Sequence, residues 1–367
     1  MTEQTEAPRL KTSKRIVYYD VLNIMAAISV VWIHFGNEVH WYEGSRVWMW
    51  CAGIQVLAYW AVPVFFMLTG ATLMNYYTKY DTAAFFKKRM LRSVRSYLIW
   101  GTLMIVLKIK RGNLEIPWDG DIRKMLFTIL DIFVNNKMES IYWFFLVLFG
   151  IYLAMPVLTL LAKPENSSIL NYTVAVGIIT VSILPFCYRM VQTYFYLGGS
   201  GWNSALQLPV LGSYLLYPVL GYWASTHDFS KIERGICYAA AIMCAILRYT
   251  GLVYLCKRDG ATNQLYFDYL SFPSLFLAFG VFVFIRYLFT ERIVCNEKIT
   301  KLLAAVSACS LGVYLIHNIV LNKMEGIAFF AKYSFRWYFF WPIICYLFCL
   351  VIVYAARKTP LLKHLFP

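Results

Sequence analysis

The stretch that decides the fold is R-I-V-Y-Y-D-V-L-N-I-M-A-A-I-S-V-V-W-I-H-F-G-N, residues 15–37. It can cross a bilayer as a helix, which takes about 20 mostly apolar residues. Residues 1–10 are polar and lack the apolar core and small-residue cleavage site of a signal peptide. We therefore expect residues 16–36 to stay in the protein as a membrane-spanning helix.

The composition of the whole chain is that of a membrane protein. Hydrophobic residues make up 60% of the 367 positions and charged residues 14%, and the mean hydropathy is +0.58. These values are too apolar for a soluble domain of this length. The strand alternation of a membrane barrel is absent. The predicted fold class is therefore an all-α, polytopic transmembrane bundle, because lipid offers backbone groups no other partner.

About ten apolar runs follow one another along the chain. They lie near residues 16–36, 50–74, 94–109, 141–161, 170–188, 205–224, 235–256, 268–289, 302–321 and 337–356. With an even number of spans, both termini share one side. If that side is cytoplasmic, 20 of the 34 Lys and Arg residues are inside, 13 are outside and Arg248 lies within a span. This excess agrees with the positive-inside rule, so we predict cytoplasmic termini.

One membrane domain, residues 16–357, accounts for nearly all of the sequence, between tails at 1–15 and 358–367. The amphipathic piece 122–135 carries charges and is expected to lie at the membrane interface. The net charge of +15 is typical of topology and anionic lipid contacts, so nucleic acid is not an expected partner. The nine cysteines are scattered without a C-x-x-C pair, and we expect neither disulfides nor a metal site.

The first span carries a polar stripe that points to chemistry. At about 100° per residue, Asp20, Asn23, Ala27 and His34 share one face, and Asn23 lies roughly 17 Å from His34 along the axis. A buried ionisable group usually faces a cavity and serves function. Imidazole suits proton transfer from a hydroxyl, and Glu38, one turn on, can orient it. The alternative is a packed histidine that is hydrogen-bonded to a neighbouring helix.

A second signal is F-F-K-K-R-M-L-R-S-V-R-S-Y, residues 85–97. Arg89 and Arg92 are three residues apart and so present their two guanidinium groups together, with Lys87 and Lys88 beside them. Such a cluster suits the phosphates of a cytoplasmic ligand. The alternative is an anchor that contacts lipid headgroups.

Other candidates carry weaker signals. Arg248 lies within a span and Asp268 begins the next, so a structural ion pair is the favoured interpretation. His317 either lines an outer cavity or is a satisfied interfacial histidine. Outer aromatic residues such as Trp41 either stack on sugar rings or form the interfacial belt. The sequence holds no G-x-S-x-G, H-E-x-x-H or P-loop motif.

Five motifs in order resemble the integral-membrane acyltransferase family 3, the O-acyltransferases of bacterial surface glycans and antibiotics. They are Y-Y-D-V-L-N-I-M-A-A-I-S-V-V-W-I-H (18–34), P-V-F-F-M-L-T-G (63–70), F-F-K-K-R-M-L-R (85–92), Y-W-F-F-L-V-L-F-G-I-Y-L-A-M-P-V-L (142–158) and L-G-V-Y-L-I-H (311–317). Each motif alone has little specificity. Together they cover most of the chain with the spacing of the family.

The resemblance implies roles for individual residues. His34 matches the family histidine thought essential for transfer, and Asp20 matches the aspartate that begins the motif. Arg89 and Arg92 match the R-x-x-R pair associated with the acyl-CoA donor. Where the family usually has an arginine, 11 residues before the histidine, this chain has Asn23. Either another cation substitutes, with Arg248 as a candidate, or the donor or the activity differs.

These observations give a functional hypothesis. We expect His34, Asp20 and Glu38 to be catalytic, Arg89, Arg92, Lys88 and Asn23 to bind acetyl-CoA or another short acyl-CoA, and Trp41, Trp143, His317 and Arg248 to bind the acceptor. The acceptor implied by the resemblance is a glycan or lipid-linked saccharide, and the location is the bacterial cytoplasmic membrane, with membrane lipid as a partner. The sequence is also compatible with a homo-oligomer. The alternative function is a transporter or exporter of a polysaccharide precursor.

Overall fold

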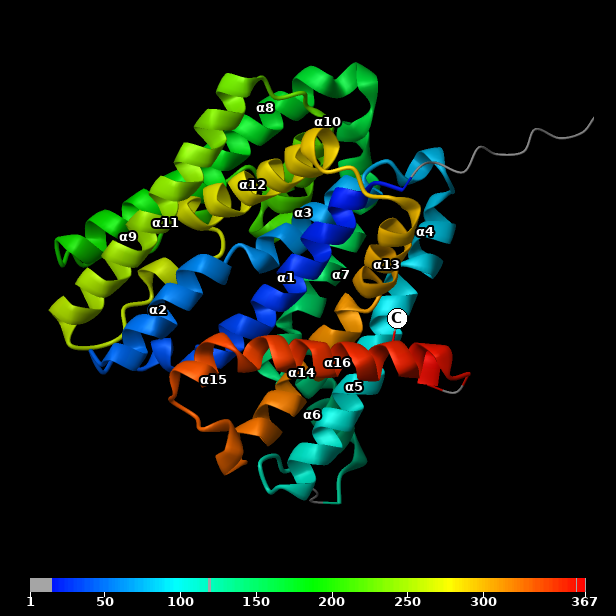
Figure 1. Cartoon of the computed structure of the whole chain (residues 1–367), viewed down its shortest axis with the longest axis vertical. Helices are drawn as coiled ribbons and strands as arrows, with labels where there is room; N and C mark the ends of the chain where they lie inside the picture. Colours follow the sequence, from blue (N-terminus) through cyan, green and yellow to red (C-terminus); the bar gives the residue numbers. More distant parts are fainter. Residues whose placement is uncertain (1–14, 118–119, 361, 367) are drawn as a thin grey trace, which may run out of the picture.

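The computed structural model describes residues 15–117, 120–360 and 362–366, and all regular structure within these ranges is helical (Figure 1). The α-helices are α1 (Val17–Phe35), α2 (Arg46–Ala58), α3 (Ala61–Leu73), α4 (Thr82–Lys88), α5 (Met90–Lys110), α6 (Ile122–Val134), α7 (Trp143–Leu158), α8 (Ser167–Gly177), α9 (Leu184–Tyr194), α10 (Leu216–Thr226), α11 (Lys231–Asp259), α12 (Phe272–Tyr287), α13 (Glu297–Ser307), α14 (Ser310–Glu325), α15 (Phe335–Phe339) and α16 (Trp341–Lys358). Of the predicted tails, residues 1–14, 361 and 367 lie outside the described residues.

Within the described part of the chain, eight helical stretches are long and apolar enough to cross a membrane. They are Val17–Phe35, Arg46–Thr78, Thr82–Lys110, Ser140–Ala162, Pro164–Tyr194, Lys231–Asp259, Leu265–Arg292 and Trp341–Lys358. A ninth arises if α13 and α14, which meet at an angle of 51°, form one broken span. The predicted polytopic helical bundle is confirmed, with fewer continuous spans than the ten predicted.

The missing span is the run at 205–224. Only its second half forms an α-helix, the 11-residue α10, and short 3₁₀ turns precede it. Pro209 has no amide hydrogen for a helix, and Ser213 adopts a positive φ of 57°, which ends any regular helix there. The prediction of a continuous span at 205–224 is therefore corrected to a half-length helix.

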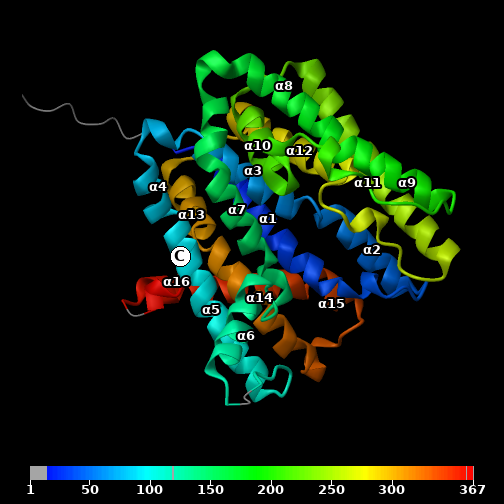
Figure 2. The same ribbon diagram turned by 180° about the vertical axis from the view of Figure 1, so that it is seen from behind.

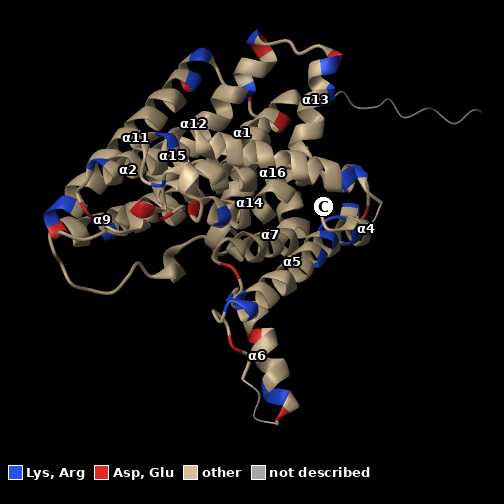
Figure 3. Cartoon of the chain, turned by 60° about the horizontal axis from the view of Figure 1, so that its bottom comes forward, with Lys and Arg blue, Asp and Glu red and all other residues tan. Residues whose placement is uncertain are grey.

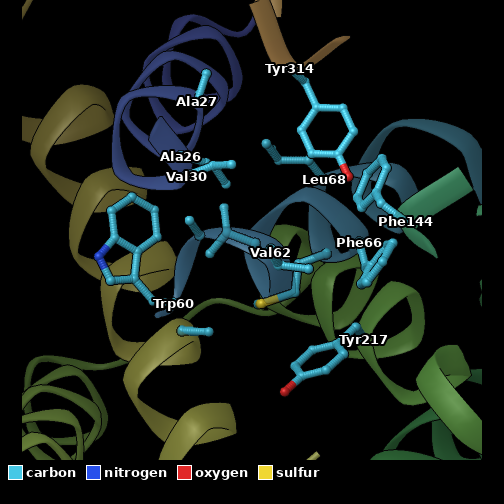
Figure 4. Packing of buried hydrophobic residues seen from close by; sticks show 14 of the residues in the cluster. Ala26, Ala27, Val30, Trp60, Val62, Phe66, Leu68, Phe144, Tyr217 and Tyr314 are labelled. Atoms are coloured by element: carbon cyan, nitrogen blue, oxygen red, sulfur yellow. The ribbon is translucent and has the colours of Figure 1, made fainter. Parts of the chain in front are cut away.

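Helix α1 lies at the centre of the bundle and packs against α2, α3, α12, α13, α14 and α16 (Figures 1 and 2). Its Leu22, Ala26 and Val30 are buried. Figure 4 shows Ala26 and Val30 of α1 on the side of Val62 of α3. Further along α3, the ring of Phe66 stacks on Phe144 of α7 at a centroid distance of 4.9 Å. Close packing of this kind holds helices together in lipid, where apolar surface alone gives no driving force.

Two glycines let the short α10 touch α3 along the backbone. A Cβ atom at Gly70 would lie 1.8 Å from the carbonyl oxygen of Pro218, and one at Gly221 would lie 2.0 Å from that of Met67. Small residues permit this approach between membrane helices, where Cα–H···O contacts add to the packing. The contact makes α10 part of the bundle although it is too short to span it.

The amphipathic piece predicted at 122–135 forms α6, which is not among the candidate spans. It projects from one end of the bundle beside α5 (Figures 1 and 3). Leu126, Phe127 and Leu130 are more than half exposed. These features agree with a helix that does not cross the membrane, and its place in the membrane interface stays a prediction.

The described ends of the chain lie at the same end of the bundle. Tyr19, near the start of α1, lines a cavity together with Arg89, which lies between α4 and α5. Arg92, one turn further on, lines a second pocket together with Lys363. This arrangement agrees with the prediction that both termini share one side of the membrane. That this side is cytoplasmic rests on the distribution of Lys and Arg.

The glycine contact between α3 and α10 gives a stability prediction. Gly221→Ala adds one carbon where the Met67 carbonyl leaves no room, so we expect the free energy of unfolding to fall by about 1–3 kcal/mol. Gly150→Ala in α7 is the matched control, because a Cβ there meets nothing within 4 Å and helix propensity favours alanine by about 1 kcal/mol. Thermal unfolding in detergent compares the two purified variants with the wild type. Equal melting temperatures for Gly221→Ala and Gly150→Ala would contradict the backbone contact.

Candidate active site

A central cavity of about 310 Å³ lies between α1, α3, α7, α14 and the junction of α4 with α5. Its lining consists of Tyr19, Asn23, Phe65, Leu68, Thr69, Thr72, Leu73, Arg89, Phe144, Leu148, Tyr152, Ser307, Ala308, Ser310, Leu311 and Tyr314. Along α7 the lining runs from Tyr152 to Phe144, which is about 12 Å of helix. Arg89 lies near Tyr152 at one end, and the rings of Phe144 and Tyr314, 5.2 Å apart, form the other end.

The cavity wall offers hydrogen-bonding groups. Ser310 is 3% exposed, and its hydroxyl has no hydrogen-bond partner among the described residues. The hydroxyls of Thr69 and Thr72 donate to carbonyls of their own helix and keep lone pairs for an outside donor. A buried hydroxyl without a partner is unfavourable. Ser310 therefore marks a position where a polar ligand would be stabilised.

Asn23 joins α1 to the break between α13 and α14. Its Nδ2 donates to the carbonyl oxygen and to the hydroxyl of Ser307, both at 2.9 Å. Ser307 ends α13, and the last carbonyls of a helix lack partners within it. The amide thus stabilises the bend. The charged residue that lines the cavity with Asn23 is Arg89, whereas Arg248 does not line it, so Arg248 does not supply the charge that is missing at position 23.

Arg89 and Arg92 face two different pockets. Arg89 stands between α4 and α5 with φ −110° and ψ −62°. Its amide donates to the Phe85 carbonyl and its carbonyl accepts from the Ser93 amide, so the helical hydrogen bonds continue through Arg89, and Thr82–Lys110 forms one candidate span. Arg89 lines the central cavity, and Arg92 lines a second pocket of about 240 Å³. Both guanidinium groups lie close enough to Tyr152 for their charges to act on it, and that one ligand binds both arginines stays a prediction. Lys88 lines neither of these pockets, and its ammonium lies 4.5 Å from the ring centroid of Tyr80.

His34, near the end of α1, and His317, in the middle of α14, lie side by side. The ring centroids of His34 and His317 are 5.1 Å apart. His317 is fully buried, and its Nδ1 lies 2.7 Å from the carbonyl oxygen of Tyr314. Because a carbonyl can only accept, Nδ1 carries the hydrogen and Nε2 of a neutral ring is left as an acceptor. That Nε2 is buried without a partner among the described residues.

Tyr314 separates the cavity from this histidine pair. Its ring lines the cavity, lies 5.7 Å from the ring of His317 and is held by a hydrogen bond from its hydroxyl to the Ile141 carbonyl. Neither His34 nor His317 lines the cavity. Of the predicted polar stripe, Asn23 alone lines it. The expected polar path along α1 is therefore interrupted, and Tyr314 closes it.

Asp20 and Glu38, which we expected to act with His34, have other partners. Arg15 donates to both carboxylate oxygens of Asp20 at 2.6 and 2.7 Å, and this hydrogen bonding raises the pKa of Arg15. Asp20 lies 14 residues before His34, about 21 Å along the helix. Glu38 pairs with Lys332 at 3.6 Å. Among the described residues, neither carboxylate is hydrogen-bonded to His34, so their positions do not support a direct catalytic role.

Arg248 is held inside the bundle by neutral groups. It is 2% exposed and donates to the Ser274 hydroxyl at 2.6 Å and to the Tyr266 carbonyl at 2.8 Å. Asp268 instead accepts from Arg189 at 2.7 Å. The predicted ion pair between Arg248 and Asp268 is therefore wrong, because α9 supplies a different partner.

Trp143 belongs to a cluster of aromatic rings that contacts Arg248. Its ring lies 5.7 Å from that of Tyr269, which stacks on Tyr59 at 4.1 Å, and the guanidinium of Arg248 lies 3.9 Å from the Tyr59 ring centroid. A cation over an aromatic face is stabilised by the ring quadrupole. Trp41, by contrast, is 65% exposed. Acceptor binding by these residues stays a prediction.

Sequence reasoning missed Ser307, Ser310 and Tyr314. Tyr314 lies in the motif L-G-V-Y-L-I-H, one helical turn before His317, so the shared helix face was a signal. Ser307 and Ser310 flank the break between α13 and α14, and residues 307–310 contain no glycine or proline that would predict it.

The family model described as an acyltransferase domain, that of acyltransferase family 3, matches residues 16–357. No curated protein and no solved structure matches the chain. The matched range contains the central cavity, the arginine at its mouth and both histidines. The chain therefore belongs to acyltransferase family 3 and is a membrane acyltransferase.

Proposed function

We propose that this chain is an O-acyltransferase of the bacterial cytoplasmic membrane. It transfers an acetyl or another short acyl group from cytoplasmic acyl-CoA to a hydroxyl of an extracytoplasmic or lipid-linked glycan. The observation that carries the proposal is the order of Arg89, the central cavity and the His34–His317 pair along α1. Family membership supports acyl transfer, and the donor, the acyl group and the acceptor are our proposal.

The dimensions of the site suit the arm of acyl-CoA. An extended chain advances about 1.2 Å per bond, so the roughly 13 bonds between the pyrophosphate and the sulfur span about 15 Å. The distance from Asn23 to His34 along α1 is about 17 Å. Arg89 at the mouth can bind the pyrophosphate, because a guanidinium matches phosphate oxygens in pairs. The free hydroxyl of Ser310 can bind an amide of the arm.

The thioester meets the histidines only when the Tyr314 ring leaves its position. That movement breaks the hydrogen bond from the Tyr314 hydroxyl to the Ile141 carbonyl. The net contribution of one such bond is about 1 kcal/mol. The contacts that the arm gains in the cavity offset this cost, so donor binding and opening are coupled.

Two chemical routes fit the histidine pair. In the first, His34 removes the proton of the acceptor hydroxyl, the oxygen attacks the thioester carbonyl, the C–S bond breaks and the thiolate leaves with the proton. In the second, a nitrogen of His34 attacks the carbonyl, the C–S bond breaks, and the CoA thiolate leaves with the proton of the imidazole to give an acyl-imidazole. The acceptor hydroxyl then attacks this acyl group, the C–N bond breaks, and the hydroxyl proton returns to His34. In either route, Nε2 of His317 can accept a proton from the second ring nitrogen of His34.

The acceptor and the location rest on the family analogy and on surface chemistry. Exposed outer aromatics such as Trp41 have flat apolar faces that stack on sugar rings. The rival function, export of a polysaccharide precursor, needs no CoA site.

CoA binding separates the enzyme from the exporter. For wild-type protein in nanodiscs we expect saturable CoA binding, weakened about tenfold or more by Arg89→Ala, because a charge-assisted contact at the cavity mouth is lost. Lys79→Ala removes a charge from an exposed position outside the cavity and serves as the control. A wild-type protein that does not bind CoA would support the exporter.

Acyl transfer depends on His34 in both routes. We expect His34→Ala, inserted at normal levels, to remove the acetyl mass shift from cell-surface glycan, since general base or nucleophilic catalysis contributes at least about 100-fold. Mass spectrometry of glycan from cells with the wild-type protein, the variant and no protein measures this. An unchanged mass shift in the variant would exclude the histidine mechanism.

The role of the unpaired Nε2 of His317 can be tested by substitution. Asparagine at this position can still donate to the Tyr314 carbonyl but has no atom in place of Nε2. We therefore expect His317→Asn to fold like wild type and to lose about 100-fold in kcat, with a similar Kd for CoA. Full activity of His317→Asn in proteoliposomes would reduce His317 to a structural residue.

A further inference from the structure

A third histidine lies just beyond the end of α1 that carries His34. His40 belongs to the short 3₁₀ helix Asn37–His40 that follows α1. The indole nitrogen of Trp48 in α2 donates to the Val39 carbonyl at 3.1 Å, which holds this turn in place. The turn packs against α2, at the end of α1 that lies away from α4 (Figure 1). His40 is therefore on the opposite side of the bundle from the mouth of the central cavity.

The ring of His40 is half-buried next to aromatic rings. Its centroid lies 4.8 Å from that of Phe267 and 6.3 Å from that of Trp41, which is 65% exposed. Among the described residues, neither ring nitrogen of His40 has a hydrogen-bond partner. Burial lowers the pKa of His40, so at neutral pH the ring is uncharged and one nitrogen keeps a free lone pair. The ring can therefore accept a proton from a ligand.

Two observations place His40 near His34. The two rings are close enough for a charge on His40 to act on His34. In addition, the Phe267 carbonyl accepts a hydrogen bond from the hydroxyl of Tyr59, and Tyr59 packs against Ile33, the residue before His34. The aromatic ring beside His40 is thus tied to the same turn of α1 that presents His34.

The three histidines form a series from the surface of the bundle to the cavity. His40 and His34 are each partly exposed, whereas His317 is fully buried. The rings of His34 and His317 are 5.1 Å apart, and that of His317 lies 5.7 Å from the ring of Tyr314 at the end of the cavity. A donor that arrives through the cavity therefore meets His317 and His34. An acceptor that arrives from the opposite surface meets Trp41 and His40.

The acyl-imidazole route requires a base on the acceptor side. Once His34 carries the acyl group, its ring is a poor base, because the acyl group withdraws electrons from it. The acceptor hydroxyl still has to lose its proton as its oxygen attacks. His317 lies on the donor side, and its Nδ1 is held by the Tyr314 carbonyl. His40 is the histidine of this series that a hydroxyl from the surface meets first.

We propose that His40 is the general base of the acceptor step. A ring nitrogen of His40 takes the hydroxyl proton while the oxygen attacks the acyl carbon on His34. The C–N bond then breaks, and His40 gives the proton to the departing nitrogen of His34, so that both rings return to their starting state. A sugar ring stacked on Trp41 brings its hydroxyl to His40. The inference rests on the proposed function and selects its acyl-imidazole route.

Two assays in nanodiscs separate the donor step from the acceptor step. Exchange of labelled CoA into acetyl-CoA measures acylation of His34 and needs no acceptor. Transfer of labelled acetyl to glycan extracted from cells that lack the protein measures both steps. For His40→Gln we expect exchange at the wild-type rate and transfer about 100-fold slower, because only the acceptor step loses its base. Added imidazole should restore part of the transfer, and His34→Ala should lose both activities.

Two further variants control for packing. His40→Phe keeps a ring beside Phe267 but has no base, so it should behave like His40→Gln. Asn37→Ala changes an exposed residue of the same turn and should keep both activities.

Transfer at the wild-type rate by His40→Gln would overturn the inference, and so would an equal loss of exchange and transfer in this variant. Transfer without exchange in the wild type would also overturn it, because the acyl-imidazole route would then be wrong while the proposed function stands. Wild-type protein that does not transfer acetyl to glycan would count against the proposed function itself.

Discussion

A polar side chain inside a bilayer has no water to bond with, so it must find a partner in the protein or in a ligand. Helix α1 meets this constraint at two residues. Arg15 donates to the carboxylate of Asp20, and the side chain of Asn23 donates to Ser307. The ring of His34 lies 5.1 Å from that of His317, with no hydrogen bond between the two rings among the described residues. The Asn23 contact joins α1 to the end of α13, at the bend between α13 and α14, and the central cavity lies beside that bend.

The sequence was sufficient for the fold class and for the main positions along α1. Apolar length predicts the helical bundle, and helical spacing separates Asn23 from His34 by a cavity-sized distance. The same reasoning did not predict that Arg89 and Arg92, three residues apart, line two different pockets. Tertiary packing decides which neighbouring elements lie beside each arginine, and a local pattern does not contain this information.

The sequence also could not predict which side chains pair with one another across the bundle. Arg248 and Asp268 are close in the sequence, yet Asp268 meets Arg189 of α9, and Arg248 is stabilised by a hydroxyl, a carbonyl and the Tyr59 ring. Spacing along one chain does not decide which of several helices arrives beside a given charge. The sequence of α1 also did not predict that the polar path along this helix is interrupted, because Tyr314 belongs to α14 and not to α1.

The position of Tyr314 bears on how an acyl group could cross without water or protons following it. A permanently open path from Arg89 to His34 would be a leak through the membrane. With Tyr314 in place, the cavity ends before the histidines. In the mechanism we propose, the arm itself displaces the ring and fills the space, so the path is either blocked by tyrosine or occupied by the donor. The same exclusion of water protects the thioester from hydrolysis until a hydroxyl arrives at the far side.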